Sequence, residues 1–280
     1  MQVEVNGTRL WFDVDGSALV PAGPTMQPRP TVILVHGGPG GWDHSYFKPD
    51  FAPLTEHAQV VYLDLRGHGR SDAGDPAAWS FEACADDLRR FCDAIGVVSP
   101  IVLGHSMGAP IVLLYGARHP GHAGGLVALS GFARFDIPRL IEGFRRVGGD
   151  EVAEFAGRGF RGEPTTDIEE AAVSSAFGPH VPDEDQEARA QKHPELGEPG
   201  MDHIRDTPIV DQLRRIVSPT LVCVGEFDPV TPVEAAREIL EALPEGIGQL
   251  EIIPGAGHWA WKDAPDVFWP MILGFVSRVS

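Results

Sequence analysis

Short apolar runs alternate along the chain with segments whose apolar residues recur every three or four positions. The runs are rich in β-branched residues and bounded by glycine, which predicts buried strands, whereas the longer spacing predicts amphipathic helices. The expected strands cover 31–37, 59–67, 101–106, 124–132, 219–228 and 249–258; the expected helices cover 80–95, 107–120, 232–243 and 265–279, with one more inside 44–57. Strand then helix, repeated, predicts an α/β fold with a mostly parallel sheet flanked by helices.

Two regions depart from this alternation. Residues 3–14 alternate apolar and polar positions around Asn6 and Gly7, which predicts an N-terminal β-hairpin. Residues 133–217 are charged and offer helical pieces but no convincing strand. Because the strands on either side must share one sheet, we interpret 133–217 as a helical lid inserted into a core domain made of 1–132 and 218–280.

Composition narrows the range of partners. The 40 acidic and 22 basic residues give a formal net charge of −18, which disfavours nucleic acid and anionic membranes as partners. No apolar run approaches the roughly 18 residues that cross a bilayer, and the first residues do not resemble a signal peptide. Three cysteines are too few for a disulfide scaffold. We expect a cytoplasmic protein with a small-molecule substrate and no membrane partner, and its oligomeric state stays open.

The stretch GHSMGA, residues 104–109, follows an expected strand and opens an expected helix. In the pattern G-x-S-x-G the serine occupies a strained turn that lifts its hydroxyl out of the sheet edge. The N-terminus of the following helix favours a negative charge that develops beside it. Ser106 is therefore the candidate nucleophile, a chance glycine and serine turn being the alternative.

A serine nucleophile needs a base, and the base needs an acid that orients it. Asp228 and His258 stand at the carboxyl ends of two expected strands, and such ends meet at one edge of a parallel sheet. Taken singly, Asp228 could be a turn residue before Pro229 and His258 a loop histidine. Their order after Ser106 instead predicts a catalytic triad.

The loop HGGPGG, residues 36–41, follows another expected strand. Acyl-transfer intermediates need two N–H donors for the oxyanion, and we expect them from Gly38 and from Met107, the residue after the nucleophile. Three residues beside these motifs are candidates for substrate contact, with ordinary packing as the alternative: Gly37, Trp42 and Trp259. The lid histidines lack metal-ligand spacing, so we predict no metal site there: His180, His193 and His203.

With these motifs, the chain resembles the α/β-hydrolases across nearly its full length. HGGPGG, LLYGARHP after the nucleophile and GEFDPVTP around the acid are most similar to the proline iminopeptidase-like branch. The resemblance implies that Ser106, Asp228 and His258 are nucleophile, acid and base, and that Gly38 and Met107 form the oxyanion hole. It also implies that no metal or organic cofactor is needed.

The substrate class stays open between several functions. DLRGHGRSD (64–72) and GHSMGA resemble the wider pool of esterases, lactonases and C–C hydrolases, whereas prolyl aminopeptidases more often show DQRG and GGSWG. The leading hypothesis is a serine hydrolase that forms an acyl-enzyme on a small ester, lactone or amide. One alternative is a prolyl aminopeptidase, which by that resemblance would hold the substrate amine with lid carboxylates such as Glu142, Glu151, Glu154, Glu169 or Glu170. Another is a non-catalytic ligand receptor with the same fold.

Overall fold

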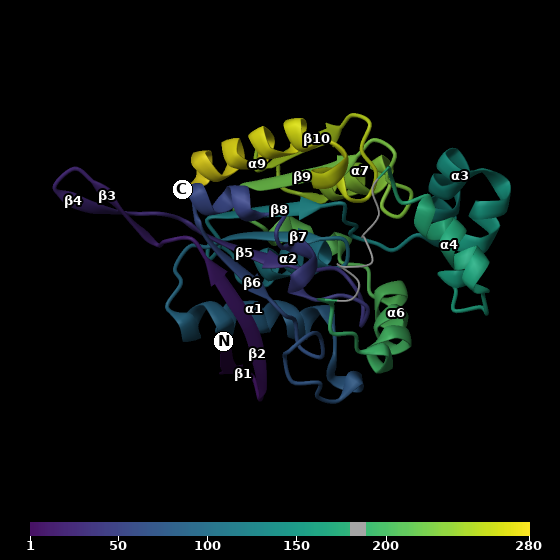
Figure 1. Cartoon of the computed structure of the whole chain (residues 1–280), viewed down its shortest axis with the longest axis horizontal. Helices are drawn as coiled ribbons and strands as arrows, with labels where there is room; N and C mark the ends of the chain where they lie inside the picture. The colour runs from purple at the N-terminus through teal and green to yellow at the C-terminus, as the bar shows by residue number, and fades with distance from the viewer. Residues whose placement is uncertain (180–188) are drawn as a thin grey trace.

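An eight-stranded sheet forms the centre of the computed structural model, which describes residues 1–179 and 189–280 (Figure 1). The strand order is β1-β2-β6-β5-β7-β8-β9-β10. The hairpin β1–β2 is antiparallel and joins β6 in antiparallel fashion, whereas all other neighbours are parallel. The strands are β1 (Gln2–Val5), β2 (Thr8–Asp15), β5 (Thr31–Val35), β6 (Gln59–Leu63), β7 (Ile101–His105), β8 (Gly125–Leu129), β9 (Thr220–Gly225) and β10 (Gly248–Ile253). The predicted mostly parallel α/β sheet and the N-terminal hairpin are confirmed.

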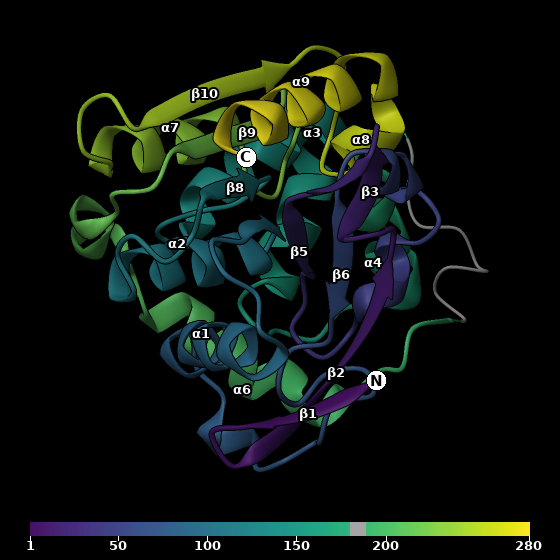
Figure 2. The same cartoon turned by 90° about the vertical axis from the view of Figure 1, so that its left-hand side faces the viewer.

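Helices cover both faces of this sheet. Successive side chains of a strand point to opposite faces, so the apolar central strands present a hydrophobic surface on each side that helices bury. Ile33 and Val35 of β5 belong to a hydrophobic layer with α1, α2 and α7, whereas Val32 and Leu34 belong to a layer with α8 and α9. Accordingly, α1 and α9 lie on opposite sides of the sheet (Figures 1 and 2). The bounds are α1 (Phe81–Ile95), α2 (Gly108–Arg118), α7 (Val233–Ala242), α8 (Ala260–Asp263) and α9 (Pro265–Val279).

The expected helix inside 44–57 is wrong. Two short 3-10 helices stand there instead, η1 (His44–Phe47) and η2 (Ala52–Glu56). Pro49, between them, has no backbone N–H to donate within a continuous helix. The sequence interpretation also missed a second hairpin, β3 (Leu19–Ala22) with β4 (Thr25–Pro28), which projects from the body of the molecule (Figure 1).

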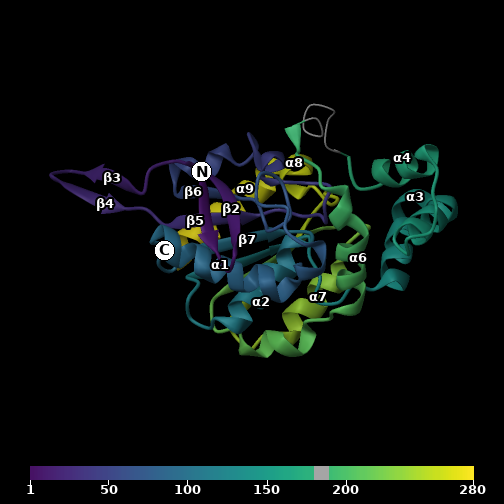
Figure 3. The same cartoon turned by 90° about the horizontal axis from the view of Figure 1, so that it is seen from below.

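The described part of residues 133–217 contains helices joined by loops, and no strand. They are α3 (Ile137–Gly159), α4 (Asp167–Ser175), α6 (Gly197–Asp206) and the short η4 (Pro194–Leu196) and η5 (Val210–Arg215); a further short helix, η3 (Pro76–Ala78), precedes α1. Leu140, Phe144 and neighbours form a small hydrophobic cluster apart from the two layers of the sheet. Figure 3 shows α3 and α4 at one end of the molecule and the β3–β4 hairpin at the other. Within the described ranges, no helix has the length and apolarity to cross a membrane.

Candidate active site

Ser106 lies directly after β7, two residues before α2 begins. Its backbone φ is 56°, a left-handed conformation that is strained for a residue with a side chain. A Cβ atom on Gly104 would lie 2.2 Å from the carbonyl oxygen of Gly108, and a Cβ on Gly108 would lie 2.3 Å from that of Val35. Both flanking positions therefore exclude any side chain, which is the physical reason for the glycine spacing around the serine.

His258 and Asp228 come together on the loops that follow β10 and β9. The Nδ1–H of His258 donates a 2.8 Å hydrogen bond to Oδ2 of Asp228, and both side chains are buried. Burial alone would raise the pKa of Asp228, but the facing His258 and the hydrogen bonds from His258 and Thr231 hold that pKa below its ordinary value. An ionised Asp228 requires the proton on Nδ1, so the Nε2 atom of His258 is left as the basic nitrogen.

One small cavity of about 140 Å³ brings the predicted residues together. Its walls are Gly37, Gly38, Trp42, Tyr46, His105, Ser106, Phe160, Phe177, Val230, His258 and Trp259. Ser106 and His258 share this cavity, although within the described chain no hydrogen bond joins the serine hydroxyl to the imidazole. The predicted contact residues Gly37, Trp42 and Trp259 all line it, and the Trp259 indole N–H is buried there with no hydrogen-bond partner among the described residues.

The loop 36–41 passes directly beside the serine. A Cβ atom on Gly37 would lie 3.1 Å from the Cβ of Ser106, and one on Gly38 would lie 3.1 Å from the Cε of Met107. Neither the backbone N–H of Gly38 nor that of Met107 donates a hydrogen bond to another described residue. The helix α2 that follows has no side-chain cap at its N-terminus. Both N–H groups expected to bind an oxyanion are thus unpaired among the described residues.

A comparison with known families decides where this arrangement belongs. The family model described as alpha/beta hydrolase fold matches residues 30–265. The chain belongs to this family. The resemblance drawn from the motifs is thereby confirmed. The protein is a hydrolase of the alpha/beta hydrolase superfamily.

Relatives of this alpha/beta hydrolase carry out different reactions. The 2-hydroxy-6-oxononadienedioate/2-hydroxy-6-oxononatrienedioate hydrolase 1 of Dechloromonas aromatica (strain RCB) is 25% identical over 268 residues, 89% of this chain and 87% of the relative. The enol-lactonase of Burkholderia xenovorans LB400 shares the fold with a TM-score of 0.72, 22% identity and coverage of 99% and 100% of the two chains. The proline iminopeptidase of Mycobacterium smegmatis does so with a TM-score of 0.80, 21% identity and coverage of 100% and 98%. Likeness to solved structures at this level shows the fold, and the substrate has to be argued from the site.

Four wall residues of the cavity were not recognised as functional candidates in the sequence: Tyr46, Phe160, Phe177 and Val230. Phe160 and Phe177 belong to the 133–217 segment and arrive at the cavity only through folding. His105, which the sequence places beside the nucleophile, also lines the wall. Proximity to a motif was the one local signal, and it was present for His105, beside Ser106, and for Val230, which lies within GEFDPVTP two residues after Asp228.

A buried cluster outside the cavity has the composition of a metal site. Ligand atoms of Asp43, His44 and Asp64 lie within 4.8 Å of one another. His44 Nδ1 is 2.7 Å from Asp64 Oδ1, and the Asp43 carboxylate accepts hydrogen bonds from the backbone N–H groups of Ser45 and Gln191. These polar atoms therefore already have protein partners. The predicted absence of a metal stays a prediction, and His180, one of the histidines behind it, lies outside the described residues.

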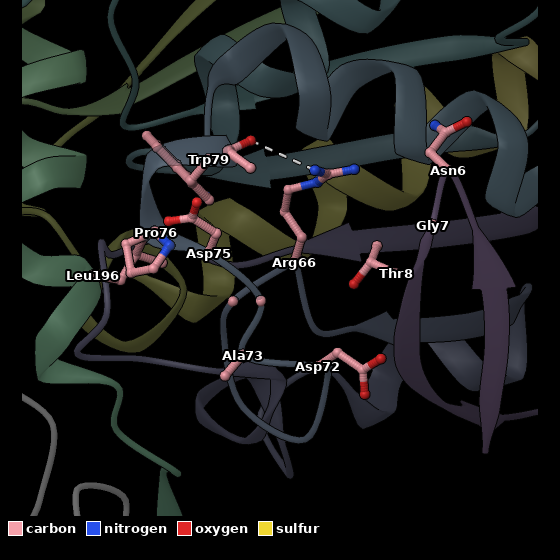
Figure 4. A pocket seen from close by; sticks show the side chains of 13 residues that line it. Asn6, Gly7, Thr8, Arg66, Asp72, Ala73, Asp75, Pro76, Trp79 and Leu196 are labelled. Atoms are coloured by element: carbon pink, nitrogen blue, oxygen red, sulfur yellow. Dashed lines mark hydrogen bonds between the residues drawn. The ribbon is translucent and has the colours of Figure 1, made fainter.

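A wider cavity of about 560 Å³ lies between the β1–β2 turn and the loop 66–79 (Figure 4). Its described lining includes no serine, cysteine or histidine. Arg66, which borders it, binds both carboxylate oxygens of Asp87 at 2.6 and 2.7 Å, so its charge is already neutralised. Arg66 also makes a weak 3.5 Å contact with the Ala78 carbonyl oxygen. This wider cavity thus lacks a serine and histidine pair, and the chemistry favours the smaller one.

Buried neutral histidines predict acid sensitivity of the fold. Burial lowers the pKa of His36 and His105, and lowers that of His68 to about 3. A histidine in the unfolded chain has a pKa of about 6.5, so below that pH the unfolded chain binds protons that these buried side chains do not bind. The free energy of unfolding therefore decreases as the pH falls, by up to about 1.4 kcal/mol per pH unit for each such histidine. The raised pKa of His193 has the opposite effect on the free energy of unfolding, but it offsets the contribution of only one of the three buried histidines. We expect the urea midpoint to drop between pH 7 and pH 5.

The matched control for this experiment is the exposed His57. His57→Gln should leave the pH dependence of the urea midpoint unchanged. A midpoint of the wild-type protein that is constant from pH 7 to pH 5 would contradict the neutral state assigned to the buried histidines.

Proposed function

We propose that this alpha/beta hydrolase is a serine hydrolase that cleaves small ester, lactone or amide substrates with an uncharged, apolar acyl group through an acyl-enzyme. One observation carries the proposal. Ser106 and the Asp228-bonded His258 line one small cavity whose remaining walls are glycine, valine, tyrosine, histidine and other aromatic side chains.

The first half-reaction follows from the proton positions. Nε2 of His258 accepts the proton of the Ser106 hydroxyl while Oγ forms a bond to the acyl carbon. The electron pair of the carbonyl π bond moves to its oxygen, and the unpaired N–H groups of Gly38 and Met107 stabilise that oxyanion. When the carbonyl re-forms, the bond to the leaving group breaks and His258 returns the proton to it.

The second half-reaction repeats these steps with water. His258 deprotonates the water, hydroxide attacks the acyl carbon, and the Ser106 oxygen leaves with the proton from His258. Asp228 stays ionised throughout and stabilises the imidazolium, which agrees with its lowered pKa and its four hydrogen bonds.

Cavity size and charge support a small, neutral acyl group. Pockets for drug-sized ligands hold roughly 300–1,000 Å³, whereas this cavity holds about 140 Å³. None of its described wall residues is Asp, Glu, Lys or Arg. We also propose that residues 133–217 act as a lid over the core formed by 1–132 and 218–280, because Phe160 and Phe177 from this segment complete the wall.

A prolyl aminopeptidase is the second candidate, supported by HGGPGG and by the fold shared with a proline iminopeptidase. It would need a free carboxylate for the substrate amine. A groove of about 510 Å³ adjoins the cavity at Phe160 and Phe177 and carries four glutamates. Three of them pair with arginine: Glu163 with Arg161, Glu169 with Arg158 and Glu198 with Arg205, whereas Glu170 accepts a hydrogen bond from the Thr165 hydroxyl and keeps its charge. The arginine pairing of three of the four glutamates supports the hydrolase of small esters, lactones or amides over the aminopeptidase.

A substrate panel tests the choice. We expect hydrolysis of p-nitrophenyl acetate and butyrate with kcat/KM roughly tenfold or more above that of the octanoate, because the cavity is short. Small lactones should be cleaved, and proline and alanine p-nitroanilides should not. Cleavage of the proline anilide would instead support the aminopeptidase, and tight ligand binding without any turnover would support the non-catalytic receptor.

A further inference from the structure

A buried hydrogen-bond chain through Tyr46 and His105 joins three segments of the site. The backbone N–H of Gly37 donates to the Tyr46 hydroxyl at 2.8 Å. That hydroxyl lies 3.1 Å from Nδ1 of His105, and Nε2 of His105 lies 3.0 Å from the carbonyl oxygen of His258. Tyr46 and His105 are each 1% exposed, so water does not compete for these bonds.

Only one arrangement of hydrogens satisfies every bond in this chain. The Gly37 N–H can only donate, so the Tyr46 oxygen accepts there and gives its own hydrogen to Nδ1 of His105. The His258 carbonyl can only accept, so Nε2 of His105 carries the proton and donates. Burial, followed by the electrostatic effect of the neighbouring His258, lowers the pKa of His105, and burial raises the pKa of Tyr46. Both groups therefore stay in the neutral forms that the chain requires.

The chain connects three separate turns of the catalytic edge. Gly37 follows β5 and immediately precedes the Gly38 donor; His105 ends β7 and immediately precedes Ser106; and His258 lies on the loop after β10. Two more histidines form hydrogen bonds with the same glycine loop. His36 Nδ1 donates to the Gly37 carbonyl at 2.6 Å, and His68 Nε2 accepts from the Gly40 N–H at 3.0 Å.

We propose that Tyr46 and His105 are positioning residues which hold the Gly38 N–H and the His258 ring in register with the Ser106 hydroxyl. The inference rests on the proposed serine-hydrolase function. Neither residue exchanges a proton with substrate in this role; each fixes a backbone group whose displacement misplaces a reacting atom. Misplacement by about 1 Å costs on the order of a hundredfold in rate, so the expected effect is on kcat.

The test compares two tyrosine hydroxyls. Tyr46→Phe removes the link and keeps the ring, and we expect kcat for p-nitrophenyl butyrate to fall roughly 10–100-fold with KM changed less than about threefold. The rate constant for labelling of Ser106 by a fluorophosphonate should fall in parallel, because the reagent needs the same attack geometry. The matched control is Tyr115→Phe, since Tyr115 is also buried and its hydroxyl bonds His122 outside the cavity. This control should keep kcat within about twofold of wild type.

A second variant separates positioning from folding. His105→Phe keeps a ring and removes both nitrogens, and kcat should again fall on the order of tenfold or more. The double variant should be no slower than the slower single variant, because the two side chains act as one chain. Wild-type kcat in either folded single variant, or losses that multiply in the double variant, would overturn the inference. Failure of the proposed function is distinct, because wild-type protein would then show no Ser106-dependent hydrolysis at all.

Discussion

Ser106→Ala is expected to lower kcat for p-nitrophenyl butyrate by roughly four to six orders of magnitude, with the protein still folded. The substitution removes the oxygen that attacks the acyl carbon, and no other serine, threonine or cysteine is among the described walls of the cavity. The remaining oxyanion donors and His258 can at most assist direct attack by water. The measurement is steady-state hydrolysis with and without fluorophosphonate, beside a thermal unfolding curve.

Ser130 provides the matched control for this variant. It follows β8, the neighbouring strand, and its backbone φ of 46° is left-handed like that of Ser106. Its hydroxyl is buried with no hydrogen-bond partner in the described chain. Ser130→Ala should therefore keep wild-type kcat and change stability by less than about 1.5 kcal/mol. If Ser106→Ala retained more than about one-hundredth of wild-type kcat, the serine mechanism would be abandoned.

Asp228→Asn is expected to lower kcat by about 10⁴-fold while KM stays near that of the wild type. The asparagine has nearly the same shape, and its oxygen can still accept from the backbone N–H groups of Val230 and Thr231 that now reach Oδ1. Its amide nitrogen would then face Nδ1 of His258 as a donor. That arrangement moves the imidazole proton to Nε2, where it blocks removal of the Ser106 proton.

A second buried pair, Asp64 with His44, serves as a control for the general effect of breaking a buried aspartate–histidine hydrogen bond. Asp64 Oδ1 lies 2.7 Å from His44 Nδ1, and hydrogen bonding and charge from His44 lower the pKa of Asp64 against the effect of burial. Asp64→Asn should lower the urea midpoint but keep kcat within about tenfold. A loss of less than tenfold in Asp228→Asn would show that Asp228 does not orient the base.

Much of this site could be predicted from local sequence because its causes are local. The glycines around Ser106 exclude side chains at distances of 2.2 and 2.3 Å from neighbouring backbone, so the turn needs that spacing. Strand and helix alternation predicted the parallel sheet, and the sheet then brought the loops carrying Asp228 and His258 to the edge that carries Ser106. The expected helix inside 44–57 failed where proline chemistry outweighed hydrophobic spacing.

Tertiary structure alone decided what surrounds Ser106. Phe160 and Phe177 reach the cavity from a segment whose own pattern says only that it is helical. The partners of the glutamates in residues 133–217 depend on which arginines packing places beside them. The link from Tyr46 to His105 spans 59 positions and that from His105 to His258 spans 153. The sequence by itself determined the turn at Ser106 and the sheet, since steric exclusion and periodicity act between near neighbours. Cavity volume, wall charge and hydrogen-bond partners were decided by the folded chain, because they depend on residues that meet only after the sheet and helices have packed.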